Sequence, residues 1–185
     1  MIPAFDHNSV LPPHLGDPRE MHHLSPYTCT IIDIVNRFAT SKARVDILTS
    51  FINFRNKIRN AGVAKNAFQW IDGSFVEDIE SLEARDPRDI DVLTVYFGYD
   101  PLFIHNVVTV LPEFRDPQLS KDNFSVDHYP LDISNHPYDT YLYVKYWTML
   151  FTHNRAGIWK GILQIELDTQ TDDDNALLSL NNWMP

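Results

Sequence analysis

DIDVLTVYF, residues 89–97, is the most strand-like segment of the chain, because β-branched and aromatic residues dominate it. Two acids, Asp89 and Asp91, stand at its start. Residues i and i+2 of a strand point to one face, with Cα atoms about 6–7 Å apart. Two unpaired carboxylates there would repel each other and lose hydration, whereas Mg²⁺ would remove both costs. The pair alone leaves open the alternative that the strand starts at a sheet edge and the acids face water.

A second motif lies upstream of this strand. Residues 68–71 (FQWI) predict a strand, residues 72–74 a turn, and residues 76–84 a short acidic helix. Gly73 would let the backbone approach a ligand closely, and Ser74 at a helix N-terminus can donate to a phosphate oxygen. A lone Gly-Ser is usually only a turn. A strand, Gly-Ser, a short helix and then Asp-x-Asp on the next strand form a much more specific pattern.

These motifs resemble the signature of the DNA polymerase β-type nucleotidyltransferase superfamily: a hydrophobic residue, Gly, Gly or Ser, a spacer, then Asp, hydrophobic, Asp or Glu, hydrophobic. Ile71-Asp72-Gly73-Ser74 and Asp89-Ile90-Asp91-Val92 match it. The spacer, residues 75–88, is slightly longer than is usual, which an insertion around residues 82–88 would explain. Most of the chain also resembles a group of small bacterial proteins in that superfamily, through FQWIDGSFVEDIE, PRDIDVLTVY, SPY (25–27), RF (37–38) and YW…FTHNR…WKG (146–161).

The resemblance implies a nucleotidyltransferase-type mixed sheet flanked by helices. It also implies metal-dependent transfer of a nucleoside monophosphate from an NTP to an acceptor hydroxyl or phosphate. Gly73 and Ser74 would hold the phosphates, and Asp89 and Asp91 would bind two Mg²⁺ or Mn²⁺ ions together with a third carboxylate. The acceptor is open between a protein, a tRNA and a small molecule, in toxin–antitoxin or phage-defence settings, and a partner protein could complete the site. The alternative is a non-catalytic nucleotide-binding or antitoxin-like module.

Two acids are candidates for the third carboxylate. Asp127 lies within a strand-like run, residues 123–129, whereas Asp132 lies beyond Pro130, which we expect to end that strand. We therefore prefer Asp127. The resemblance adds Lys145 as a candidate phosphate ligand, with a lysine that extends from a buried helix as the alternative. Lys160, beside a tryptophan, is a further nucleotide-binding candidate, or else an ordinary surface residue.

The sequence predicts the α/β (α+β) class and one domain, residues 28–185, preceded by an arm, residues 1–27, that holds five of the twelve prolines. The arm either wraps the domain or stays loose. Within the domain we expect a helical layer (28–62), a catalytic core (66–132) and a C-terminal helix, strand and helix (137–185). Ser41 is the expected N-cap of the main helix and Gly62 its stop. Residues 101–111 are ambiguous between helix and strand, and residues 138–151 predict a buried aromatic helix.

Charged and sulfur-containing residues limit the function classes. Twenty-five acids against fifteen bases give a formal charge of −10, which argues against binding duplex DNA through the overall field. The basic stretch of residues 44–59 is either a solvated face or a phosphate-binding surface. The acidic run of residues 172–174 suits a helix N-terminus. Cys29, the single cysteine, excludes a disulfide framework within the chain, and the eight histidines match no zinc spacing and predict loop and surface positions.

The N-terminal residues lack the pattern of a secretion signal, and no run of 18 apolar residues suggests a membrane span. We therefore expect a soluble, cytoplasmic protein.

Overall fold

A mixed five-stranded sheet lies at the centre of the computed structural model, which describes residues 2–134 and 136–184. The strand order is β1-β5-β2-β3-β4, and β3 runs antiparallel to β2 and parallel to β4. The predicted α+β class is confirmed. The strands are β1 (Tyr27–Thr28), β2 (Ala67–Asp72), β3 (Ile90–Tyr96), β4 (Val126–Asp132) and β5 (Leu163–Glu166).

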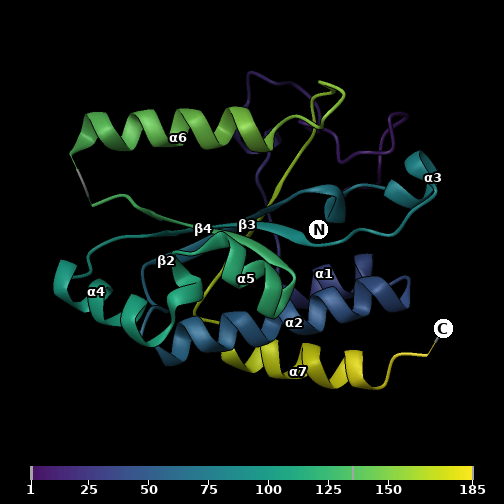
Figure 1. Cartoon of the computed structure of the whole chain (residues 1–185). Helices are drawn as coiled ribbons and strands as arrows, with labels where there is room; N and C mark the ends of the chain where they lie inside the picture. The colour runs from purple at the N-terminus through teal and green to yellow at the C-terminus, as the bar shows by residue number, and fades with distance from the viewer. Residues whose placement is uncertain (1, 135, 185) are drawn as a thin grey trace.

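Most of the helices cover one face of the sheet (Figure 1). The main core lies between them and the strands, and Phe51, Phe54 and Ile58 are fully buried in it. Ser41 caps the longest helix by accepting a hydrogen bond from the backbone N–H of Arg44, as predicted. The helices on this side are α1 (Ile31–Phe38), α2 (Lys42–Asn60), α4 (Pro101–Val110), α5 (Pro117–Phe124) and α7 (Gln170–Asn181).

Several short helices join the longer elements. They are α3 (Ile79–Glu83) and the 3-10 turns η1 (Met21–His23), η2 (Ser74–Val76) and η3 (Pro112–Phe114). The ambiguous segment after residue 100 is helical because Asp100 caps it and Pro101 occupies its first position.

Two arginines of α2 are buried, which corrects both alternatives for the basic stretch. Arg55 donates to Asp173 at 2.8 Å and to Gln69 at 2.6 Å, and Arg44 donates to Glu80 at 2.5 Å. Asp173, from the acidic run in the first turns of α7, is itself fully buried. Buried charges need such partners because losing hydration is costly. Arg55 of the basic stretch therefore links α2 to the sheet and to α7 through buried hydrogen bonds.

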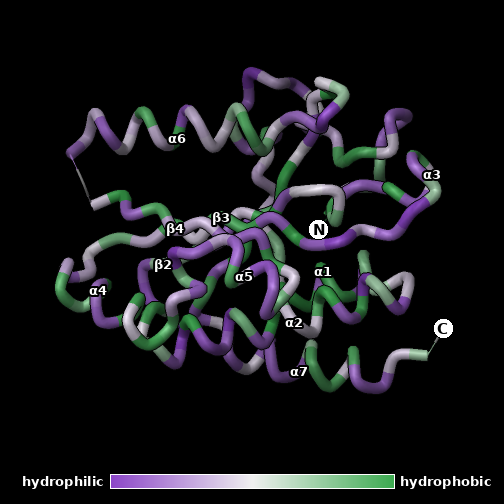
Figure 2. Tube along the Cα trace, in the orientation of Figure 1, coloured by the Kyte–Doolittle hydropathy of each residue, from purple (hydrophilic) through white to green (hydrophobic). Residues whose placement is uncertain are grey.

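Helix α6 (Pro137–Phe151) is the helix that covers the opposite face of the sheet (Figure 1). Its Trp147 and Phe151 pack against a small second core that includes Leu93. The expectation of a buried helix is wrong: Tyr141 is 59% and Met149 56% exposed, and Figure 2 shows hydrophobic and hydrophilic residues mixed along the helix. Among the described residues, no second layer packs on its outer side.

The N-terminal arm wraps the domain. Leu11 is fully buried, and its carbonyl accepts a hydrogen bond from the N–H of Gly161 at 2.7 Å. Further along, the hydroxyl of Tyr27 donates to the carbonyl of Pro12 at 2.6 Å. The arm then enters the sheet as β1, which pairs parallel with β5. Of the two expectations for residues 1–27, wrapping is therefore the one observed for the described part.

Two expectations about the segment that forms β4 are corrected. Pro130 does not end β4, because β4 is the edge strand and a proline there costs no ladder hydrogen bond. His128 is fully buried rather than at the surface, and its Nε2 lies 2.7 Å from the hydroxyl of Thr94. Burial lowers the pKa of His128 to about 3.

Across the described residues, none of the helices combines the length and the apolar character that a bilayer span requires.

Candidate functional site

A row of carboxylates crosses three neighbouring strands at one end of the sheet. Asp72 ends β2 and lies opposite Asp91 at the start of β3, which in turn lies opposite Asp127 at the start of β4. Asp89 precedes β3 and adds its charge to the environment of Asp91. The parallel pairing of β3 and β4 brings their N-terminal ends to the same edge of the sheet. The structure thus places Asp127 opposite Asp91 on the neighbouring strand, and a shared metal site stays a prediction.

Gly73 allows the chain to turn directly over this row. It has φ +84°, a conformation that favours glycine, and it begins the turn η2, whose first residue is Ser74. A Cβ atom at position 73 would overlap the carboxylate of Asp91. The glycine predicted from the motif is therefore required both by backbone conformation and by the close approach of the acid.

A cavity of about 710 Å³ opens over these residues. It lies on the side of the sheet that α6 covers, because side chains two residues further along each strand, such as Leu93 and Tyr129, pack toward α6. The C-terminal end of α6 and the following loop form the opposite wall, through Met149 and Arg155 among others. The floor contains Ser74, Asp89, Asp91 and Asp127.

Burial and neighbouring acids raise the pKa values of two carboxylates in this row. Burial raises the pKa of Asp91 to about 7, and the nearby charges of Asp72, Asp89 and Asp127 raise it further. Burial also raises the pKa of Asp72 to about 6, although Lys160 opposes that shift. Such raised pKa values mean that negative charge at the site is not fully compensated by the chain itself.

Lys160 fixes the loop at one side of the site. Its buried Nζ lies 2.8 Å from Asp72, 2.5 Å from Glu77 and 3.1 Å from the carbonyl of Gly73. Burial alone would lower the pKa of Lys160, but the two carboxylates outweigh it and the pKa is raised. The alternative of an ordinary surface residue is wrong, because Lys160 is buried, and its nucleotide-binding role stays a prediction. Its ammonium group is nevertheless engaged with three partners.

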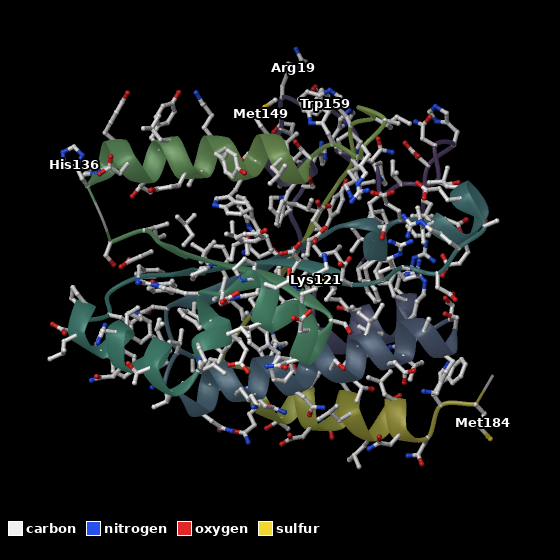
Figure 3. The ribbon with its side chains drawn as sticks, in the orientation of Figure 1. Arg19, Lys121, His136, Met149, Trp159 and Met184 are labelled. Atoms are coloured by element: carbon white, nitrogen blue, oxygen red, sulfur yellow. The ribbon has the colours of Figure 1, made fainter. Side chains whose placement is uncertain are left out.

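Lys121, which the sequence reasoning missed, also contacts the carboxylate row, and Figure 3 shows it beside the sheet, near α5. It projects from α5, and its Nζ lies 2.5 Å from Asp89 and 3.5 Å from Asp127. The hydrogen bond to Asp89 raises the pKa of Lys121, and the charges of both carboxylates add to the shift. Only the fold brings this lysine to Asp89, 32 positions earlier, so no motif signalled it.

Two sequence candidates lie elsewhere. Lys145 is exposed on α6 and takes no part in the lining of this cavity. Asp132 stands at the far end of β4 and lines a different cavity of about 660 Å³, between that strand and α6. Cys29, the single cysteine, is buried, and burial raises the pKa of its thiol to about 12.

Comparison with known proteins places the chain in a family. Residues 3–166 match the family described as "Family of unknown function (DUF6932)". The chain belongs to this family. No curated protein and no solved structure matches it.

The carboxylate row of this DUF6932 member has the donor chemistry that a magnesium site needs. Hard carboxylate oxygens are the ligands that Mg²⁺ prefers, and Asp89, Asp91 and Asp127 supply them from neighbouring segments. In the described residues, no three His, Cys, Asp or Glu side chains already surround one point as metal ligands. The ammonium of Lys121 contacts Asp89 and Asp127 in this arrangement. Asp89, Asp91 and Asp127 are the residues that would hold a divalent ion.

Proposed function

We propose that this chain is a metal-dependent nucleotidyltransferase, which moves a nucleoside monophosphate from an NTP to an acceptor hydroxyl or phosphate. The observation that carries the proposal is the pairing of Asp91 with Asp127 on adjacent parallel strands, beneath the Gly73-Ser74 turn. Two acids on one strand cannot surround two ions, so transfer by a two-metal mechanism needs a carboxylate from a second strand. Asp127 supplies it in this arrangement.

Each part of the cavity has a separate task in this proposal. The turn at Gly73 brings backbone close to the phosphates, and the Ser74 hydroxyl donates to a phosphate oxygen. Asp89, Asp91 and Asp127 would hold Mg²⁺ or Mn²⁺. When bound, the ion would neutralise charge on the phosphates and make the attacking hydroxyl more acidic. Lys160 keeps the Gly73 loop in place through its contact with the Gly73 carbonyl.

Asp127 is the candidate acceptor of the proton from the attacking hydroxyl. Tyr129 lies two residues further along the same face of β4. Burial, followed by the nearby Asp127, raises the pKa of Tyr129 to about 12, so this hydroxyl keeps its proton. Tyr129 therefore does not compete with Asp127 for the proton.

The test measures binding and transfer separately. Calorimetry with ATP, GTP, CTP and UTP, each with and without Mg²⁺, should show binding that needs the ion. Incubation with α-labelled NTP, Mn²⁺ or Mg²⁺, and mixed protein, tRNA and small-molecule acceptors should yield labelled product. Asp127→Asn should keep most nucleotide binding and lose transfer, whereas Asp174→Asn, an exposed acid of α7, should change neither. Failure of all four NTPs to bind would reject the proposal.

A non-catalytic nucleotide-binding module is the second candidate function. It is favoured by one observation, the ammonium of Lys121 between Asp89 and Asp127, where transfer would require metal. The two candidates differ in one result. A module binds NTP and gives no labelled product with any acceptor, whereas the enzyme gives product that the Asp127→Asn variant does not.

A further inference from the structure

Two lysines serve the carboxylate row, and the structure holds them differently. Lys160 is buried, and three oxygen partners surround its Nζ. The side chain of Lys121 is 43% exposed, and its Nζ contacts the carboxylates of Asp89 and Asp127. Lys160 is thus a fixed part of the fold, whereas Lys121 is a long flexible side chain that extends from α5 to the edge of the cavity.

The place that Lys121 occupies is the one that a bridging cation would take. Asp89 and Asp127 belong to neighbouring strand segments, and one ammonium group contacts both of them. Without that ammonium, four acids would lie close to one another: Asp72, Asp89, Asp91 and Asp127. Lys160 would then remain as a cation beside them. Like charges so close raise one another's energy, so a resident cation stabilises the metal-free chain.

We propose that Lys121 is the resident counter-cation of this site, which a divalent ion displaces and which then turns to the phosphates of the nucleotide. The inference rests on the proposed function. The same cavity is lined by Lys121 and by Ser74, so a displaced ammonium stays within the space that the phosphates would fill. A half-exposed lysine loses little by the move, because it exchanges one set of anionic oxygens for another.

The proposal makes the metal and the nucleotide respond to one substitution in opposite directions. Lys121→Met should bind Mn²⁺ alone about tenfold more tightly than the unchanged protein, because the ion no longer competes with an ammonium. The same variant should bind the Mg²⁺ complex of its preferred NTP about tenfold more weakly, because a phosphate partner is missing. A purely structural role would weaken both. Mn²⁺ binding is followed by calorimetry or electron paramagnetic resonance of the NTP-free protein, and MgATP, MgGTP, MgCTP and MgUTP are titrated separately.

Arg85 provides the matched control. It lines the same cavity, but its guanidinium pairs with Glu83 at 2.6 Å. Arg85→Met removes the same unit of charge, so it reports the general field effect on Mn²⁺ binding, which should be less than twofold. Lys121→Arg keeps the cation, and its Mn²⁺ affinity should stay within about threefold of the unchanged protein. Circular dichroism checks that each variant is folded.

The outcomes separate this inference from the proposed function. If neither the unchanged protein nor Lys121→Met binds Mn²⁺, the metal-dependent function itself fails. If Mn²⁺ binds both with equal affinity, or Arg85→Met tightens binding as much as Lys121→Met, the resident-cation inference is overturned while the function stands. Unchanged MgNTP affinity in Lys121→Met would overturn the move to the phosphates.

Discussion

The α2 side of the sheet and the α6 side both hold charged groups away from water, but they balance those charges differently. Toward α2, Arg55 and Asp173 are both fully buried and directly paired, and Arg59 adds a second cation at 2.6 Å from Asp173. Toward α6, the pKa of Asp91 is raised to about 7 because burial and three neighbouring acids outweigh the cations present. The charges on the α2 side are paired within the chain, whereas the acids on the α6 side outnumber the cations that contact them.

The polar groups of the α2 side extend the same contrast. Arg55 donates to Gln69, whose amide donates to Thr94, whose hydroxyl lies 2.7 Å from His128. This chain of hydrogen bonds crosses β2, β3 and β4 beneath the carboxylate row. Hydrogen bonds between buried polar groups help to fix a single packing arrangement. The comparison teaches that the α2 side supplies stability, while the α6 side keeps the unbalanced charge that binding can use.

Breaking the Arg55 pair should give the largest loss of stability. Arg55→Met leaves Asp173 buried with Arg59 as its remaining cation and removes a donor from Gln69 and Thr169. Removing one partner of a buried ion pair costs about 3–5 kcal/mol, and the loss should approach the lower value because Arg59 remains. Urea denaturation of the variant measures it. Lys57→Met, on the exposed side of the same helix, should change stability by less than about 1 kcal/mol.

Truncation of Phe51 should cost about 3 kcal/mol, the next largest effect. The side chain is fully buried between α2 and the sheet, and its removal leaves a cavity in the main core. The comparison predicts a smaller loss for Trp147→Ala on α6, whose ring packs against the smaller core on the other side. Equal losses in thermal or urea unfolding would show that both sides contribute alike.

Local patterns were enough to predict the elements that the two sides share. The β-branched and aromatic residues of the run 89–97 identified β3, and Ser41 and Gly62 marked the ends of α2. The Gly73-Ser74 turn and the Asp89–Asp91 pair were also predicted, since their geometry depends on neighbours in the chain. Asp127 was selected because it lies within a strand-like run, and the parallel pairing of β4 with β3 then places it opposite Asp91.

Long-range partners were beyond the sequence. Arg55 meets Asp173 across 118 positions, so the basic stretch of α2 could not be distinguished from a solvated face. Aromatic composition predicted a buried α6, but burial depends on what packs against the outer side of a helix. The same limit hid Lys121 and the role of Asp72, because their importance comes from tertiary position alone.

A methyl group at Gly73 should disturb the α6 side selectively. Gly73→Ala forces a side chain into φ +84° and against the Asp91 carboxylate, so we expect a loss of about 1–3 kcal/mol and weaker MgNTP binding. Gly157→Ala serves as the control for backbone strain. It has φ +76° and open space around a new Cβ, so it should lose stability without loss of MgNTP binding. Equal effects on MgNTP binding would contradict the role of the turn.

The pH dependence of stability should reveal the unbalanced charge. The pKa of Asp91 is about 7 in the folded chain and 3.8 as the reference value, so the folded state holds the proton more tightly. Stability contributed by this group is therefore present below about pH 4 and is lost as the pH rises toward 7. Asp91→Asn removes that loss and should gain about 1–2 kcal/mol at pH 8 without metal, with little change at pH 4. Chemical denaturation at both pH values measures the difference. Asp174→Asn, an exposed acid, should show no such pH-dependent gain.

Substitutions on the outer side of α6 should change stability least, and they test whether that side of the helix contributes to stability. Tyr138 and Tyr141 of α6 are more than half exposed and line neither of the two cavities. Substitution of an exposed side chain with few contacts changes stability by less than about 0.5 kcal/mol. Tyr138→Ser and Tyr141→Ser should each stay within that limit, whereas Trp147→Ala on the inner side should exceed it. A loss above about 2 kcal/mol in either outer variant would mean that α6 is stabilised by its outer residues. The contrast between a stabilising α2 side and a charge-bearing α6 side would then be wrong, because exposed residues of α6 would also stabilise the fold.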